Sequence, residues 1–166
     1  MIIRLSKGDL HEAKMLALDT VVLLEHMGKG PRLDDPKQSR VEANKIGFMA
    51  EFAVCRAFGT EPPRLNIATD GGVDLWMDDI SVDVKLTNTG KLIFDSMDKF
   101  KANVAVLATT TDEPDCIKLL GWTGRTRFEE MHHKHDFGYG ERLVMDADDL
   151  FEVSLLWHRI TERRLG

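Results

Sequence analysis

Cysteine is scarce in this chain, with Cys55 and Cys116 the two among 166 residues. They lie far apart and fit no ligand or disulfide spacing, which argues against a disulfide-stapled scaffold and a cysteine zinc site. Isolated thiols of this kind are typical of a reducing compartment. We therefore expect a cytoplasmic protein in which both thiols are reduced and buried.

Long apolar runs are also missing. None approaches the roughly 18 residues of a membrane span, and the N-terminal segment lacks the basic and then apolar layout of a secretory signal. The composition is 43% hydrophobic and 30% charged, which is that of a folded globular protein. We expect one domain spanning residues 1–166, with no membrane segment.

Positive charge is not in excess, since the formal net charge is −6. This argues against a protein that coats nucleic acid, because neutralisation of phosphates drives such binding. A nucleic-acid enzyme stays possible. Acidic side chains around a metal make the total more negative, while local basic patches can still hold a backbone.

Two stretches in the first third of the chain have apolar residues at helical spacing, 6–27 and 39–58. Ser6 is a suitable N-cap for the first, and Gly59 a suitable end for the second. The segment 28–36 is predicted to be a loop. We expect the first helix to pack on its own domain, with a dimer interface as the alternative use of its apolar stripe.

Further elements are predicted downstream. A continuous apolar run predicts a strand buried on both faces at 103–110. Shorter patterns predict strands at 91–94, 116–122 and 143–146, a helix at 126–132 that opens on a Thr126–Glu129 capping box, and a strand or helix at 151–160. Trp76 and Trp122 are expected in the core.

The stretch Gly72–Thr87 carries the strongest functional pattern. It reads as two short strands joined by an acidic turn, and in the second strand apolar residues alternate with polar ones. Asp83 and Lys85 therefore emerge on one face of that strand. If the strands pair, Asp74 of the first can approach Asp83, so that two carboxylates and one ammonium converge.

Such a patch suits a hard divalent cation. Mg²⁺ prefers oxygen ligands and retains several waters, so Asp74, Asp83 and the backbone carbonyl of Val84 are a sufficient set. Lys85 would orient or deprotonate the attacking water and contact a phosphate. Glu51 of the second helix would bind a second metal or order water. Hydrolysis of a phosphodiester is the reaction that these groups suit best.

One face of the second helix supports a role for Glu51. Arg40, Asn44, Gly47 and Glu51 follow one another at steps of four, three and four, so they share a face. Arg40 and Asn44 are candidate phosphate contacts, with structural hydrogen bonds as the alternative. Thr87 continues the face of Asp83 and Lys85 and is a candidate substrate contact.

These residues together resemble the PD-(D/E)XK nuclease superfamily. The resemblance lies in Glu51 within Ile-Gly-Phe-Met-Ala-Glu-Phe-Ala, in Gly-Val-Asp74-Leu and in Val-Asp83-Val-Lys85, and it covers 40–122, about half the chain. It implies an α/β, restriction-endonuclease-like fold with a mixed central β-sheet flanked by helices. Residues 1–38 would be an N-terminal helix and loop, 39–122 the catalytic core and 123–166 a C-terminal extension.

The resemblance also assigns roles. It implies Asp74 and Asp83 as Mg²⁺ ligands, with Mn²⁺ as a substitute, Lys85 as the catalytic lysine and Glu51 as the accessory carboxylate. The chain departs from the family pattern at Val73, where proline is usual, and at Asp83, where glutamate is commoner; the family tolerates both. A bacterial or bacteriophage protein acting in the cytoplasm fits this resemblance.

The leading hypothesis is thus a Mg²⁺-dependent nuclease that acts on DNA, as an endonuclease or an exonuclease. A junction-resolving nuclease would work as a homodimer through the first helix. A protein that keeps the fold and binds DNA or protein without catalysis is the alternative from another class. A surface ion-pair cluster and a metal role for His132, His133 and His135 are weaker alternatives.

Overall fold

The computed structural model describes residues 1–27, 40–65 and 72–165. The predicted loop at 28–36 lies outside the described residues. The helices of the described chain are α1 (Lys7–His26), α2 (Arg40–Phe58), α3 (Arg125–Met131) and α4 (Val153–Leu165). The strands are β1 (Ile2–Arg4), β2 (Leu75–Met77), β3 (Ile80–Leu86), β4 (Lys91–Phe94), β5 (Val104–Thr110), β6 (Cys116–Gly124), β7 (His133–Asp136) and β8 (Glu141–Asp146). Two short 3-10 turns are η1 (Met97–Lys99) and η2 (Ala147–Asp149).

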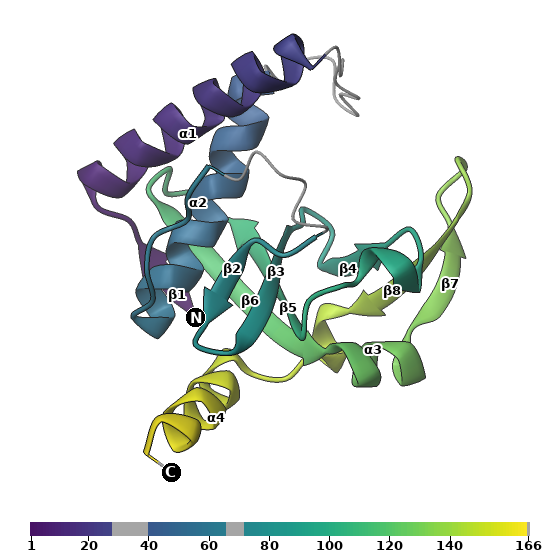
Figure 1. The fold of residues 1–166 in the computed structure, drawn as a ribbon. Helices are drawn as coiled ribbons and strands as arrows, with labels where there is room; N and C mark the ends of the chain where they lie inside the picture. Colours follow the sequence, from purple (N-terminus) through teal and green to yellow (C-terminus); the bar gives the residue numbers. More distant parts are fainter. Residues whose placement is uncertain (28–39, 66–71, 166) are drawn as a thin grey trace.

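The main sheet is mixed and has five strands in the order β1-β6-β5-β3-β2 (Figure 1). β3 and β5 are parallel, and the other neighbours are antiparallel. A second, antiparallel sheet of order β4-β8-β7 stands beside it. The α/β class and the mixed sheet flanked by helices are therefore confirmed. The second sheet was not predicted, and neither was β1.

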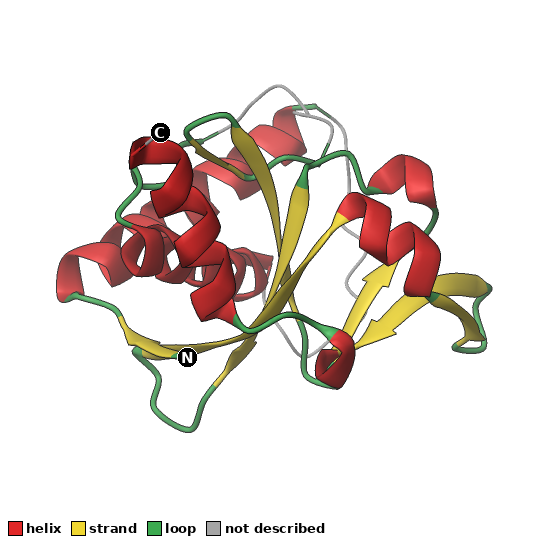
Figure 2. Ribbon diagram, turned by 90° about the horizontal axis from the view of Figure 1, so that it is seen from below, coloured by secondary structure: helices red, strands yellow, loops and turns green. Residues whose placement is uncertain are grey.

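The main sheet is covered on both faces (Figure 2). On one face lie α1, α2 and α4, and their apolar residues form a core with Val82, Val104 and Val106 of the two parallel strands. On the other face, residues of β4, β8 and α3 form a second core with Ala105 and Leu107 of β5. β5 is buried on both faces, as its continuous apolar run predicted.

The register between the parallel strands decides which core each residue of β3 faces. Asp83 is paired with Ala105 and Lys85 with Leu107, so both polar side chains point to the face of the second core. The sequence predicted a half-buried strand with one solvated face. This expectation is wrong for Asp83, which has no exposed surface, because the second sheet covers that face.

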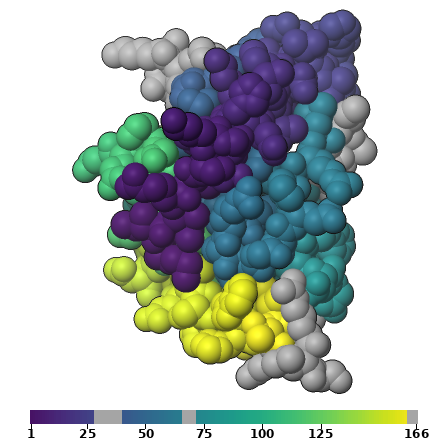
Figure 3. Space-filling model, turned by 90° about the vertical axis from the view of Figure 1, so that its left-hand side faces the viewer, coloured from purple at the N-terminus to yellow at the C-terminus, as the bar shows by residue number. Residues whose placement is uncertain are grey.

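The first helix lies over the second, as Figure 3 shows, with α4 below them. Ser6 caps α1 as predicted: its side chain accepts a hydrogen bond from the Asp9 amide, and Asp9 Oδ2 accepts one from the Ser6 amide. Asp9 also accepts a bond from Arg56 Nε of α2 at 3.1 Å. One carboxylate therefore both caps α1 and ties it to α2. Leu18 and Val22 of α1 stay exposed, and homodimerisation through them stays a prediction.

Two local expectations are wrong, the cap at Thr126 and the burial of Trp76, while the helix expected at 126–132 is present as α3. The helix predicted to open on Thr126 begins at Arg125 after Gly124, which has no side-chain cap, because β6 runs on to Gly124 and the Arg125 amide donates to the Asn103 carbonyl. The segment 151–160, left open between strand and helix, falls within α4 apart from its first two residues. Trp122 is buried as expected, but Trp76 of the edge strand β2 is 63% exposed.

No helix in the described ranges is both long and apolar enough to cross a membrane.

The Asp9–Arg56 contact predicts pH-dependent stability. The hydrogen bond from Arg56 lowers the pKa of Asp9 below its ordinary value. The stabilisation is therefore full above the pKa of the unfolded state and is lost as pH falls below about 4. Asp9→Asn should lower the free energy of unfolding by about 1–2 kcal/mol at pH 7, with the difference vanishing at acid pH. Denaturant titrations at several pH values measure this.

Asp19→Asn is the matched control, because Asp19 is an exposed acid of the same helix. An Asp9 variant that loses the same stability at pH 3 as at pH 7 would contradict the electrostatic explanation.

Candidate active site

The hairpin of β2 and β3 brings Asp74 opposite Asp83. The turn at Asp78 has a positive φ of 55°, and Leu75 pairs with Val82 just beyond it. Asp74 is therefore in register with Asp83, and its amide donates to the Val82 carbonyl at 2.8 Å. The apposition follows from the alternation pattern and a two-residue acidic turn.

β2 begins at Leu75 and pairs with β3 only as far as Val82. Beyond Val82, within the described chain, this edge of β3 has no neighbouring strand and is called the open edge. The Asp74 side chain lies at that edge, where its Oδ2 accepts a hydrogen bond from the Val84 amide at 2.7 Å. The amide and carbonyl of a strand residue point to the same side, so the Val84 carbonyl faces the same open edge. The carboxylate of Asp74 and this carbonyl thus offer oxygen atoms side by side.

Asp83 is the buried acid of the site. It has no exposed surface, and its Oδ1 lies 2.6 Å from Lys85 Nζ. The lysine side chain is 38% exposed, so it reaches from solvent to the buried carboxylate. Its Nζ also lies 5.3 Å from the centre of the Phe94 ring of β4. Phe94 therefore positions Lys85, a role that the sequence did not indicate.

Glu51 lies in the middle of α2, half-buried. α2 packs on the valine face of β3, opposite the face of Asp83 and Lys85. Burial raises the pKa of the neighbouring Cys55 thiol to about 11, and the charge of Glu51 acts in the same direction. The carboxylates of Glu51, Asp74 and Asp83 do not all lie within 4.8 Å of one another. Glu51 in the same site stays a prediction, in which it acts through water around the open edge.

The three candidate substrate contacts make structural hydrogen bonds. Arg40 forms a salt bridge with Glu25 of α1 at 3.1 Å, and the side-chain amide of Asn44 donates to the Arg40 backbone carbonyl at 2.9 Å. The Thr87 hydroxyl accepts from the amides of Thr89 and Lys91, at 3.1 and 3.3 Å, and so shapes the turn into β4. Contact of these residues with a substrate stays a prediction.

Two hollows flank the hairpin. One, of about 630 Å³, is lined by Gly72, Lys85, Ile93, Phe94, Asp95, Lys99 and Lys101. A side chain at Gly72 would place its Cβ 3.2 Å from the Lys99 carbonyl, so glycine permits this close approach. The other, of about 390 Å³, contains Asp74 beside the exposed Trp76. Trp76, which the sequence predicted to lie in the core, instead offers a stacking face next to Asp74.

A competing acidic cluster already has a cationic partner. Glu113, Asp115 and Cys116 are the group, among the residues the structure describes, whose ligand atoms lie within 4.8 Å of one another. Arg4 forms salt bridges with both acids, so a guanidinium offsets one of the two negative charges that would attract a cation. The histidines give no support for a metal site either, because His133 and His135 are exposed on β7 and no such group of described residues contains them.

The oxygen atoms at the hairpin fit a hard divalent cation. Two carboxylates and one backbone carbonyl are the sparse set that Mg²⁺ uses while keeping most of its waters. A cation that reaches Asp83 competes with the Lys85 ammonium, and the partial exposure of Lys85 lets that ammonium turn to solvent or to an anionic substrate. No family model, curated protein or solved structure matches this chain.

Metal binding at Asp83 predicts a stability signature. Mg²⁺ or Mn²⁺ at ten times its dissociation constant should stabilise the protein by about 1.4 kcal/mol, or about 3–6 °C in Tm. Asp83→Asn breaks the salt bridge to Lys85, so its metal-free Tm should fall by a few degrees, while its response to metal disappears. Differential scanning fluorimetry across a metal titration measures both.

Asp112→Asn, at an exposed acid of the β5–β6 turn, should keep the full response to metal. An equal response in the Asp83 variant would place the metal elsewhere.

Proposed function

We propose that this protein is a Mg²⁺-dependent nuclease that hydrolyses phosphodiester bonds of DNA at the β2–β3 hairpin. The proposal is carried by one observation: the Asp74 carboxylate stands at the open edge of β3, opposite a buried Asp83 whose charge is met by Lys85. A buried carboxylate is costly, and a merely structural hairpin would gain stability from an apolar residue there.

The metal would be held by Asp74, Asp83 and the Val84 carbonyl. When bound, Mg²⁺ makes a coordinated water more acidic and neutralises charge on a phosphate oxygen. Asp74 keeps its orientation through the Val84 amide, and Asp83 keeps its orientation because the surrounding core leaves it no freedom. Ligands fixed in this way need little reorganisation when the substrate arrives.

Lys85 supplies the mobile positive charge. Its Nζ lies between Asp83 and the Phe94 ring, and its side chain opens to the hollow beside β4. In the proposed reaction it contacts the scissile phosphate and orients the attacking water. The water oxygen forms a bond to phosphorus and loses a proton to solvent, while the bond to the leaving oxygen breaks and that oxygen takes up a proton from solvent. Glu51 orders water at the open edge of β3, as the accessory carboxylate.

A protein that binds DNA or protein without catalysis is the second candidate. The salt bridge between Asp83 and Lys85 favours it, because a closed ion pair is stable without metal. Such a protein would bind nucleic acid and cut nothing, whether the site is intact or disrupted. The nuclease would cut with the site intact, and with the site disrupted it would lose turnover but keep binding.

Cleavage assays separate these candidates. Plasmid and single-stranded DNA are incubated with Mg²⁺ or Mn²⁺ and with the unsubstituted protein, Asp74→Ala, Asp83→Ala or Lys85→Ala. Each substitution should lower the cleavage rate at least about a hundredfold, because each removes a ligand or the group that acts on the water. Glu51→Gln should have a smaller effect, since it acts through water.

Asp112→Ala is the control and should cut at the unsubstituted rate. Circular dichroism of every variant checks the fold. Cleavage that persists in the Asp83 and Lys85 variants would reject this site, and a metal-stabilised protein that never cleaves would favour the non-catalytic candidate.

A further inference from the structure

Nine of the seventeen lysines and arginines whose side chains are described have a carboxylate within 4.0 Å. The exceptions, among cations whose side chains are described, are Lys7, Lys14, Lys99, Lys101, Lys118, Arg125, Arg127 and Arg159. In a protein of net charge −6, acidic side chains outnumber basic ones, so a basic side chain without an acidic partner is notable. Their positions therefore carry information.

Five of these cations line two hollows that have Lys101 in common. Lys99 and Lys101 line the hollow beside Lys85. Lys101 also lines a second hollow of about 620 Å³, together with Arg125, Arg127 and Arg159. Lys101 is thus shared, and the cations follow one path from the candidate active site to the end of β6 and on to α4.

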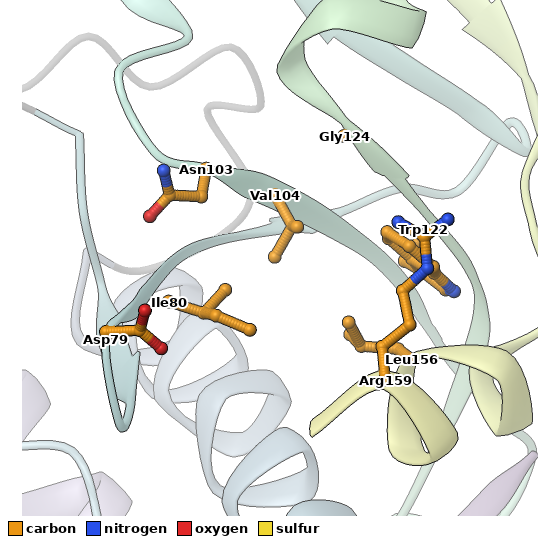
Figure 4. A pocket seen from close by; sticks show the side chains of 8 residues that line it. All are labelled: Asp79, Ile80, Asn103, Val104, Trp122, Gly124, Leu156 and Arg159. Carbon is orange, nitrogen blue, oxygen red and sulfur yellow. The ribbon is translucent and has the colours of Figure 1, made fainter. Parts of the chain in front are cut away.

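The second hollow holds its arginines in place. Arg159 of α4 lies 5.4 Å from the centre of the Trp122 ring. Figure 4 shows its guanidinium beside that ring in an adjoining hollow, which Asp79 and Asn103 line on the opposite wall. Arg127 lies 4.4 Å from the Phe151 ring. Both guanidinium groups are positioned by aromatic rings and without a carboxylate, so their charge remains available to an anion.

Backbone contacts complete the arrangement. Arg125 Nε donates to the Phe100 carbonyl at 2.7 Å, and an Arg127 terminal nitrogen donates to the Asp149 carbonyl at 3.1 Å. Carbonyl oxygens fix the guanidinium planes but do not cancel their charge. Glu130 is the acid among the residues lining this hollow, and it makes no salt bridge to them.

The residues of this hollow are better suited to bind the repeated phosphates of a nucleic-acid backbone than its bases. Trp122 is 2% exposed, so it offers no face on which a base could stack. Gathering four cations on one groove costs repulsion that a polyanion removes. Arginine forks suit phosphate oxygens, and contacts to phosphates position a nucleic acid without reading its sequence.

We propose that Lys99, Lys101, Arg125, Arg127 and Arg159 form a phosphate track that binds the nucleic-acid backbone where it leaves the candidate active site. The identity of the ligand rests on the nuclease function proposed above. The track makes binding independent of sequence and strongly dependent on salt, and it leads the strand away from Lys85 on the side of α3 and α4.

The salt dependence of binding tests the track without any need for cleavage. A labelled duplex and a labelled single strand of mixed sequence are titrated with protein in EDTA, and fluorescence anisotropy gives the affinity at several salt concentrations. Lys101→Gln and Arg159→Gln should each reduce the slope of log affinity against log salt by about 0.9 on duplex or about 0.7 on single strand. In 0.1 M salt the affinity then falls about fivefold to eightfold for each substitution.

Lys14→Gln and Lys118→Gln are matched controls, because they also remove exposed cations without acidic partners but lie on α1 and on the far part of β6. Both should bind with the unsubstituted slope. Slopes that fall equally in controls and track variants, or that change in neither, would overturn the track. It would also be overturned if neither the duplex nor the single strand bound.

The same experiment separates the track from the nuclease. A reduced slope in the track variants of a protein that never cuts with Mg²⁺ would sustain the track and reject the enzyme. Metal-dependent cleavage with unchanged slopes in the track variants would sustain the enzyme and reject the track.

Discussion

The fully buried carboxylate of Asp83 is the constraint on which the rest of this structure depends. An ionised acid with no exposed surface costs several kcal/mol unless a counter-charge reaches it. Lys85 supplies that charge from two residues along the same strand. Because both side chains must share a face, β3 cannot slip by one residue against β5 without driving Asp83 into the core of valines. The pair therefore fixes the register of the central strands.

The second sheet makes that arrangement possible. Phe94 and Phe100 stack with ring centres 4.5 Å apart, and Phe128 packs edge-on against both. These rings seal the face of the main sheet on which Asp83 lies, and Phe94 lies under the Lys85 ammonium. One aromatic cluster thus joins two sheets, lowers the local dielectric around the ion pair and leaves an opening to solvent beside Lys85.

Local patterns in the sequence predicted the hairpin, and with it the apposition of Asp74 and Asp83, because strand alternation and turn chemistry act over a few residues. The burial of Asp83 and the place of Phe94 depend on the pairing of β4 with β8, some fifty residues apart, which no local pattern encodes. At Thr126 a local capping signal was overridden by continuation of β6. The basic residues near Trp122 come from three separate segments, so local sequence patterns could not predict that they converge.

The pairing of β1 with β6 has a consequence for biosynthesis. Ile2 lies opposite Lys118, so β1 is synthesised more than a hundred residues before its partner strand exists. Closing so long a loop is entropically slow, and the outer edge of β6 stays uncovered until it closes. Unpaired edges recruit other strands. Nascent chains of this protein are therefore expected to be most prone to aggregation in the interval between synthesis of β6 and docking of β1.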